Sequence, residues 1–89
     1  MSLDINQVKG TVRNFVFERF LRNSEEKELT FSTPLISGGI IDSILTMQLV
    51  VFLEETYGFE FQPHEVDKDN LDSIDIIAAF VVKKLNEGK

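Results

Sequence analysis

Apolar residues recur at helical spacing in three segments of this chain, and no segment alternates over the length that a strand needs. Spacings of three and four residues align apolar side chains on one face of a helix. The three patterns predict helices that begin near Ile5, at Ser43 and near Ile74. The one alternating run, residues 59–61, is too short for a strand. We therefore predict an all-α fold, a small four-helix bundle of three main helices and one short helix.

The ends of these helices carry recognisable signals. Asp4 can cap the first helix, which should fade at Asn23-Ser24. The second should run to about Tyr57 and stop at Gly58. The short helix is expected over Pro63–Val66, with proline at its start. The faces expected to be buried are, in chain order, Ile5, Val8, Val12, Phe15, Val16 and Phe20; Thr46, Leu49, Val50, Leu53 and Tyr57; and Ile74, Ile77, Ala78, Val81 and Leu85.

A long connection joins the first helix to the second. Its charged start, residues 25–28, is typical of a solvated loop, whereas residues 31–41 are apolar and interrupted by proline and glycine. We expect its Leu35, Ile36, Ile40 and Ile41 to pack on the core. A connection this long without helix or strand is unusual inside a compact domain and is often functional.

The composition excludes several classes of function. Residues 1–89 are too few for a second domain. The chain has no cysteine and one histidine, so disulfides, zinc sites and a conventional catalytic triad are not expected, and we predict no metal centre and no enzyme. The segment from Asp67 begins like a calcium loop but has Asp72 at the required glycine and Ala78 at the terminal glutamate. No apolar run is long enough to cross a membrane, and the lack of cysteine favours a cytoplasmic location.

The acidic charge is concentrated in the middle of the chain. The net charge is −6, and residues 38–76 hold nine acids and one base, Lys68. Such a field repels nucleic acid and anionic lipid and attracts basic protein surfaces. We therefore expect protein partners and neither nucleic acid nor membrane.

The second helix carries more apolar surface than a small bundle can bury. Beside its main face, Ile44, Met47 and Val51 form another stripe at spacings of three and four. This second stripe must face a partner, a ligand or the long loop, although the loop has its own apolar residues to bury. Glu54 and Glu55 are expected to flank it. Together these five residues form the predicted partner-binding surface.

The tripeptide Asp-Ser-Ile occurs twice, each time at the predicted start of a helix. Asp and Ser at such positions are usually caps, and we assign the second copy, Asp72-Ser73-Ile74, to capping, with Asp75 completing a signal like a capping box. The first copy follows Gly38-Gly39 and opens the helix with two stripes. A phosphoester at Ser43 would lie at the positive end of that helix.

The residues around Ser43 resemble the acyl and peptidyl carrier proteins. The resemblance rests on Gly39-Ile40-Ile41-Asp42-Ser43-Ile44, followed by a helix that ends in Leu53-Glu54-Glu55-Thr56-Tyr57-Gly58. It continues through Phe61, the acidic residues 65–69 and Asn70-Leu71-Asp72-Ser73-Ile74, and so covers nearly the whole chain in order. The attachment motif of the family is usually Asp-Ser-Leu, and here Ile44 replaces the leucine.

The resemblance implies a single carrier domain, residues 1–89, with 4′-phosphopantetheine on Ser43 beside Asp42. A phosphopantetheinyl transferase would install this arm from coenzyme A, and its thiol would hold the cargo as a thioester. The further partners would be an acyl- or aminoacyl-loading ligase and a downstream transferase or synthase, with the carrier acting as a monomer. The alternative is a non-catalytic helical interaction module without a prosthetic group.

The nature of the cargo stays open. Fatty-acid carriers commonly have acids early in the second helix, where this chain has Leu45 and Gln48. Ser43-Ile44-Leu45 is more similar to peptidyl carriers, whereas Asp42 replaces the histidine common in that branch. The pattern therefore favours an aminoacyl or specialised acyl cargo, as in nonribosomal peptide or polyketide biosynthesis, over a cargo of fatty acid biosynthesis.

Overall fold

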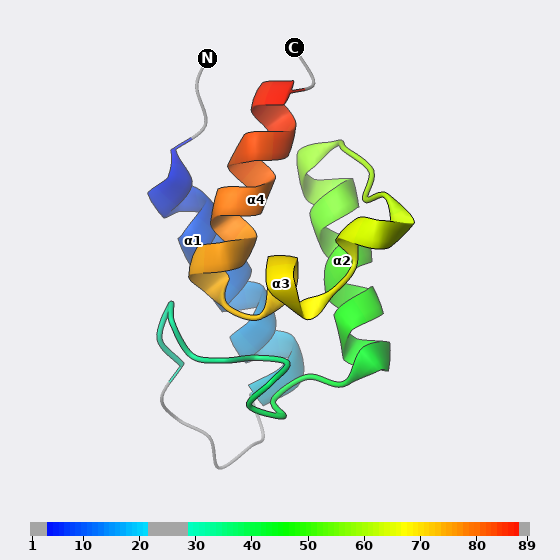
Figure 1. Cartoon of the computed structure of the whole chain (residues 1–89). Coiled ribbons are helices and arrows are strands. Elements are labelled where there is room, and N and C mark those ends of the chain that lie inside the picture. Colours follow the sequence, from blue (N-terminus) through cyan, green and yellow to red (C-terminus); the bar gives the residue numbers. More distant parts are fainter. Residues whose placement is uncertain (1–3, 22–28, 88–89) are drawn as a thin grey trace.

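Four α-helices make up most of the described chain. The computed structural model describes residues 4–21 and 29–87, and within these ranges it contains α1 (Ile5–Val16), α2 (Ser43–Tyr57), α3 (Lys68–Leu71) and α4 (Ile74–Glu87) and no strand. The chain runs down α1 and up both α2 and α4, with the short α3 beside them (Figure 1). The prediction of an all-α fold is confirmed, as is the number of helices in the described chain. No helix in the described ranges is long and apolar enough to cross a membrane.

The core is formed where α1, α2 and α4 meet. α1 packs mainly against α4, and the main face of α2 closes the core. The buried residues of the three helices are Val8, Val12, Val16, Thr46, Leu49, Val50, Leu53, Ile74, Ile77, Ala78 and Val81. All eleven lie on the faces that the helical spacing predicts. Ile5 was expected among them but is 37% exposed, because it lies at the first position of α1, beyond the end of the core.

Aspartates cap the first two long helices. The Asp4 carboxylate accepts a hydrogen bond from the Asn6 N–H at 2.9 Å, and the Asp42 carboxylate accepts one from the Leu45 N–H at 2.9 Å. Each bond satisfies one of the N–H groups that a helix start leaves without an intrahelical partner. α2 ends at Gly58, as the sequence predicts.

α1 continues into a π-helical turn, Phe17–Leu21, that the sequence does not predict. The wider turn places the Arg19 guanidinium 5.4 Å from the centre of the Phe15 ring, and Phe20 packs edge-on against the same ring. The expected end of the first helix at Asn23-Ser24, and the solvated loop at residues 25–28, lie outside the described residues.

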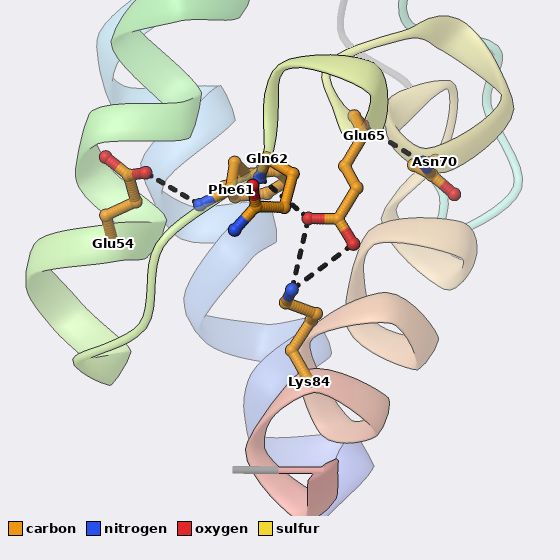
Figure 2. A network of polar contacts seen from close by, with 6 residues as sticks. All are labelled: Glu54, Phe61, Gln62, Glu65, Asn70 and Lys84. Atoms are coloured by element: carbon orange, nitrogen blue, oxygen red, sulfur yellow. Dashed lines mark hydrogen bonds and ion pairs between the residues drawn. The ribbon is translucent and has the colours of Figure 1, made fainter.

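The short helical turn predicted at Pro63–Val66 is present as a 3₁₀ turn, Pro63–Glu65, with proline at its start. The short α-helix, α3, begins three residues after Glu65, at Lys68, and was not predicted. A four-residue helix has no apolar period to detect, and α3 is anchored by one buried side chain, Leu71. The preceding 3₁₀ turn is held by Glu65, whose carboxylate accepts hydrogen bonds from the Gln62 N–H at 2.8 Å and from Lys84 at 3.1 and 3.2 Å (Figure 2).

The start of α4 also differs from the prediction. Ser73, not Asp72, caps the helix, since its hydroxyl oxygen accepts a hydrogen bond from the Ile76 N–H at 3.1 Å. The Asp72 carboxylate instead accepts hydrogen bonds from the N–H groups of Ile36 and Ser37. Asp75 forms an ion pair with Lys9 at 2.9 Å rather than completing a capping box.

The described part of the long connection, residues 29–42, packs on the helices. Leu35 and Ile41 are buried, and Ile36 and Ile40 are partly buried against the core, as the sequence predicts. The backbone is tied to the α3–α4 junction, because the Leu35 N–H donates to the Asp72 carbonyl at 2.6 Å. In Figure 1 this segment crosses beneath the helices and leads directly into α2.

Candidate functional site

Ser43 occupies the first position of α2, and its side chain is exposed. Asp42 supplies the cap, so the Ser43 hydroxyl is not needed to complete the helix end. Within the described residues this hydroxyl makes no hydrogen bond. It is therefore accessible from solvent and takes no part in capping α2.

Two glycines shape the approach to this serine. Gly39 has φ +78°, a left-handed conformation that side chains other than glycine rarely adopt. At Gly38, a Cβ would overlap the Pro34 carbonyl oxygen. The tight turn before α2 thus requires both glycines, and it presents Asp42 and Ser43 at the surface.

Ser73, in the second copy of Asp-Ser-Ile, has the opposite environment. Ser73 is 7% exposed, and its hydroxyl oxygen accepts the hydrogen bond from the Ile76 N–H. The two copies therefore divide capping differently, because Asp42 caps α2 whereas Ser73 caps α4. Of the two serines, Ser43 alone offers a free hydroxyl at the surface.

The second apolar stripe of α2 is exposed. Ile44 is 70% exposed, Met47 51% and Val51 46%, which places three of the large exposed apolar residues of the described chain on one side of one helix. The described part of the long loop does not cover them. Such a contiguous apolar surface is typical of an interaction site.

An open groove of about 760 Å³ runs along this stripe between α2 and the end of α1. Phe15 and Phe52 stack at its side, with ring centres 3.9 Å apart. Arg19 lies at the rim of the groove, and Ser43 contributes to the lining at the N-terminus of α2. The lining residues are Phe15, Arg19, Ser43, Ile44, Met47, Gln48, Val51, Phe52 and Glu55.

A second hollow borders Ser43 on the other side of α2. It is smaller, about 460 Å³, and lies between the long loop, the first turns of α2 and the segment before α3. Its lining includes two carboxylates, Asp42 and Asp67, and one amine, Lys68. Ser43 and Met47 border both hollows.

The two glutamates expected beside the stripe, Glu54 and Glu55, have different environments in the structure. Glu55 is exposed and lines the groove. Glu54 is half-buried, and its carboxylate accepts a hydrogen bond from the Phe61 N–H at 2.8 Å (Figure 2). Glu54 thus fixes the segment that follows α2, and of the two acids Glu55 is the one beside Met47 and Val51.

The groove includes residues that the sequence did not suggest for the site. Phe15 was assigned to the core, and Arg19 to no site at all. Spacing offered a partial signal, because Phe15 and Arg19 are one helical turn apart and so share a side of the first helix. Their meeting with α2 depends on tertiary packing, which one helix does not reveal.

The described residues contain no group of three or more His, Asp or Glu side chains that could hold a metal ion. No protein-family model matches the chain, and no curated protein matches it closely enough to count as a relative.

Proposed function

We propose that this chain is a carrier protein that holds acyl or aminoacyl cargo as a thioester on a 4′-phosphopantetheine arm attached to Ser43. The observation that carries the proposal is the free, exposed hydroxyl of Ser43 at the start of α2, beside an exposed apolar stripe. The residues around Ser43 resemble those of carrier proteins, and this resemblance is the reason for proposing phosphopantetheine as the group attached to the hydroxyl.

The residues around Ser43 suit a phosphodiester. Because the Asp42 carboxylate engages Leu45, the N–H groups of Ser43 and Ile44 at the start of α2 have no side-chain partner in the described chain. Free N–H groups and the positive end of the helix dipole favour an anion at this position. The bound arm would supply the thiol, a nucleophile that the cysteine-free chain lacks.

The stripe is the proposed docking surface for the enzymes that serve the arm. These are a phosphopantetheinyl transferase, a loading ligase and a downstream transferase or synthase. Ile44, Met47 and Val51 provide the apolar contact, and Glu55 at the groove rim attracts basic side chains of a partner. The near half of α2 carries Leu45 and Gln48 rather than acids, so apolar contact should contribute most of the affinity.

The exposed stripe by itself also fits a second function, a helical interaction module without a prosthetic group. The stripe would serve such a module whether or not Ser43 is modified. The two functions therefore differ in one measurable property, the uptake of phosphopantetheine.

The test is the intact mass after incubation with coenzyme A and a promiscuous phosphopantetheinyl transferase. Wild type and Ser73→Ala should gain the mass of one phosphopantetheine, whereas Ser43→Ala should gain none and stay folded. The Ser73→Ala control alters the same tripeptide at the other helix start. Wild type without a mass gain, or loading that survives Ser43→Ala, would contradict the proposal.

A further inference from the structure

Arg19 places a positive charge at the rim of the α1–α2 groove, and no carboxylate of the described chain pairs with it. Its side chain is exposed, and within the described residues its guanidinium interacts with the Phe15 ring alone. Lys9 and Lys84, by contrast, each meet a carboxylate of this chain, at 2.9 and 3.1 Å. The Arg19 charge is therefore available to a partner, in a chain with 15 acids and 9 bases.

The local backbone and the Phe15 ring hold this guanidinium in place. Arg19 lies in the π-helical turn Phe17–Leu21, and a π-helical turn that continues an α-helix is rare and frequently marks a functional site. The guanidinium lies over the face of the Phe15 ring, 5.4 Å from its centre. This contact leaves the N–H groups of the guanidinium free to donate, in the planar arrangement that matches a carboxylate. Arg19 is thus pre-organised to bind a carboxylate that the described chain does not supply.

Arg19 and Glu55 lie on opposite sides of the stacked Phe15 and Phe52 rings along the groove. α1 and α2 run in opposite directions (Figure 1), and the stacked rings set Phe15 level with Phe52. Arg19 follows Phe15 by four residues, about 6 Å toward the Ser43 end of the groove. Glu55 follows Phe52 by three residues, about 4.5 Å away from that end. The two opposite charges are therefore about 10 Å apart along the groove, with apolar surface between them.

A helix of a partner protein fits this spacing. Residues seven positions apart on a helix share a face and lie about 10 Å apart, so an acid and a base at that spacing can meet Arg19 and Glu55 together. Apolar side chains three and four positions after the acid then lie over Met47 and Val51, as when an amphipathic helix binds a groove. A partner surface with bases alone would bring a positive charge to Arg19, and like charges in an interface oppose binding.

We propose that Arg19 determines partner specificity, because the partner enzyme places a helix in the α1–α2 groove with a carboxylate on Arg19, apolar side chains on Met47 and Val51, and a base on Glu55. This inference rests on the docking surface of the proposed function and names the chemistry of the partner. α1 thereby contributes to an interface that the sequence assigned to α2 alone.

A pair of synthetic peptides tests the proposal without the natural partner. The first is an alanine-rich peptide of about 20 residues, long enough to form a helix in water. It carries a glutamate, leucines three and four positions later, and a lysine seven positions after the glutamate. The second peptide has glutamine in place of the glutamate and is otherwise identical. The difference in affinity between the two peptides measures the contribution of the carboxylate.

The unmodified wild type should bind the glutamate peptide about threefold more tightly than the glutamine peptide, within the range of an exposed ion pair. Arg19→Gln should bind both peptides equally, because it removes the partner of the carboxylate and leaves the apolar stripe. Lys83→Gln is the matched control, since it removes an exposed cation on α4, and it should keep the threefold preference. Equal binding of the two peptides by wild type, or a preference that survives Arg19→Gln, would overturn the inference.

NMR of ¹⁵N-labelled protein locates the bound peptide. The glutamate peptide should shift the amide signals of Met47 and Val51, and it should shift the side-chain Nε–H signal of Arg19 more than the glutamine peptide does. Shifts confined to the region of Ile76 and Lys83 would place the peptide on α4 and contradict the inference. Spectra that do not change with either peptide would contradict it as well.

The proposed carrier function and this inference fail in different ways. Peptide binding uses the unmodified protein and does not depend on phosphopantetheine. A protein that gains the mass of phosphopantetheine but binds both peptides equally contradicts the role of Arg19 and leaves the carrier function intact. A protein that gains no mass but shows the preference for the glutamate peptide contradicts the carrier function, and its groove is then the docking site of an interaction module.

Discussion

The Ser37 hydroxyl donates a hydrogen bond to the Asp72 carboxylate at 2.7 Å, across 35 residues of sequence. The same carboxylate accepts hydrogen bonds from the Ile36 N–H at 2.8 Å and the Ser37 N–H at 2.9 Å. One side chain at the start of α4 thereby fixes the loop that leads to Ser43. The position of the candidate attachment site thus depends on a contact remote from α2.

This contact makes stability depend on pH. The hydrogen bond from the Ser37 N–H, then those from the Ser37 hydroxyl and Ile36, lower the pKa of Asp72 against the opposing effect of burial. Because the pKa is lower in the folded state, the contribution of Asp72 is present above the unfolded pKa of about 3.9 and is lost as the pH falls through the folded pKa. Asp72→Asn should therefore lose less unfolding free energy than wild type between about pH 6 and pH 3.

Urea unfolding at a series of pH values measures this difference. Asp69→Asn is the control, since it removes an exposed carboxylate that makes no hydrogen bond in the described chain, and its profile should follow wild type. The Glu65 pKa is lowered too, first by the Gln62 N–H and then by Lys84, so the Asp72 variant should keep part of the acid dependence. Parallel profiles for wild type and Asp72→Asn would contradict the assignment.

The neighbouring glutamates of α2 should respond differently to the same substitution. Glu54→Ala removes the acceptor for the Phe61 N–H and should lower the unfolding free energy by about 1 kcal/mol. Glu55→Ala removes an exposed carboxylate and should stay within about 0.5 kcal/mol of wild type. Chemical denaturation measures both, and each variant is the matched control of the other.

Glu54→Ala and Glu55→Ala should also differ in the rate at which the protein is loaded with phosphopantetheine. Glu55→Ala should slow transfer by the phosphopantetheinyl transferase, with the largest effect at low salt, because Glu55 lies on the proposed docking surface. Glu54→Ala should load at the wild-type rate. Equal slowing by both variants would show that Glu54 also reaches the partner.

Helical spacing predicted the buried faces because one stripe on each long helix does most of the packing. Val8, Val12 and Val16 could be assigned from spacing alone. The exposed stripe was foreseen for the same reason, since α2 has more apolar positions than one face can bury. α3 was missed because four residues contain no period.

The side-chain bonds could not be predicted, since they join distant parts of the chain. Asp72 and Ser73 present the same cap signal as Asp42 and Ser43, and sequence does not show which residue of each pair caps. That choice depends on Ser37, which approaches Asp72 and occupies its carboxylate. The groove likewise depends on Phe15 meeting Phe52, a contact between separate helices.

Charge repulsion in the middle of the chain should make stability depend on salt. Residues 38–76 carry nine acids and one base, and their repulsion in the compact state is weakened by counterions. Moderate salt, or a millimolar divalent cation, should raise the melting temperature, although screening also weakens the Lys84–Glu65 and Lys9–Asp75 ion pairs. A circular-dichroism melt across the titration measures the shift, and a flat or falling melting temperature would count against the repulsion.

The exposed stripe should be needed for docking and dispensable for folding. Met47→Glu and Val51→Glu place a charge on a surface that is already half exposed, so the helical circular-dichroism spectrum and the unfolding free energy should stay near wild type, within about 0.5 kcal/mol. Loading of the unmodified protein by a phosphopantetheinyl transferase should fall at least about tenfold in kcat/KM, the equivalent of ~1.4 kcal/mol of lost contact. Ile76→Glu, a similar charge on α4, should load normally. Because the unmodified protein carries no arm, a slower rate reports on docking alone, and wild-type kinetics in both α2 variants would remove the stripe from the partner interface.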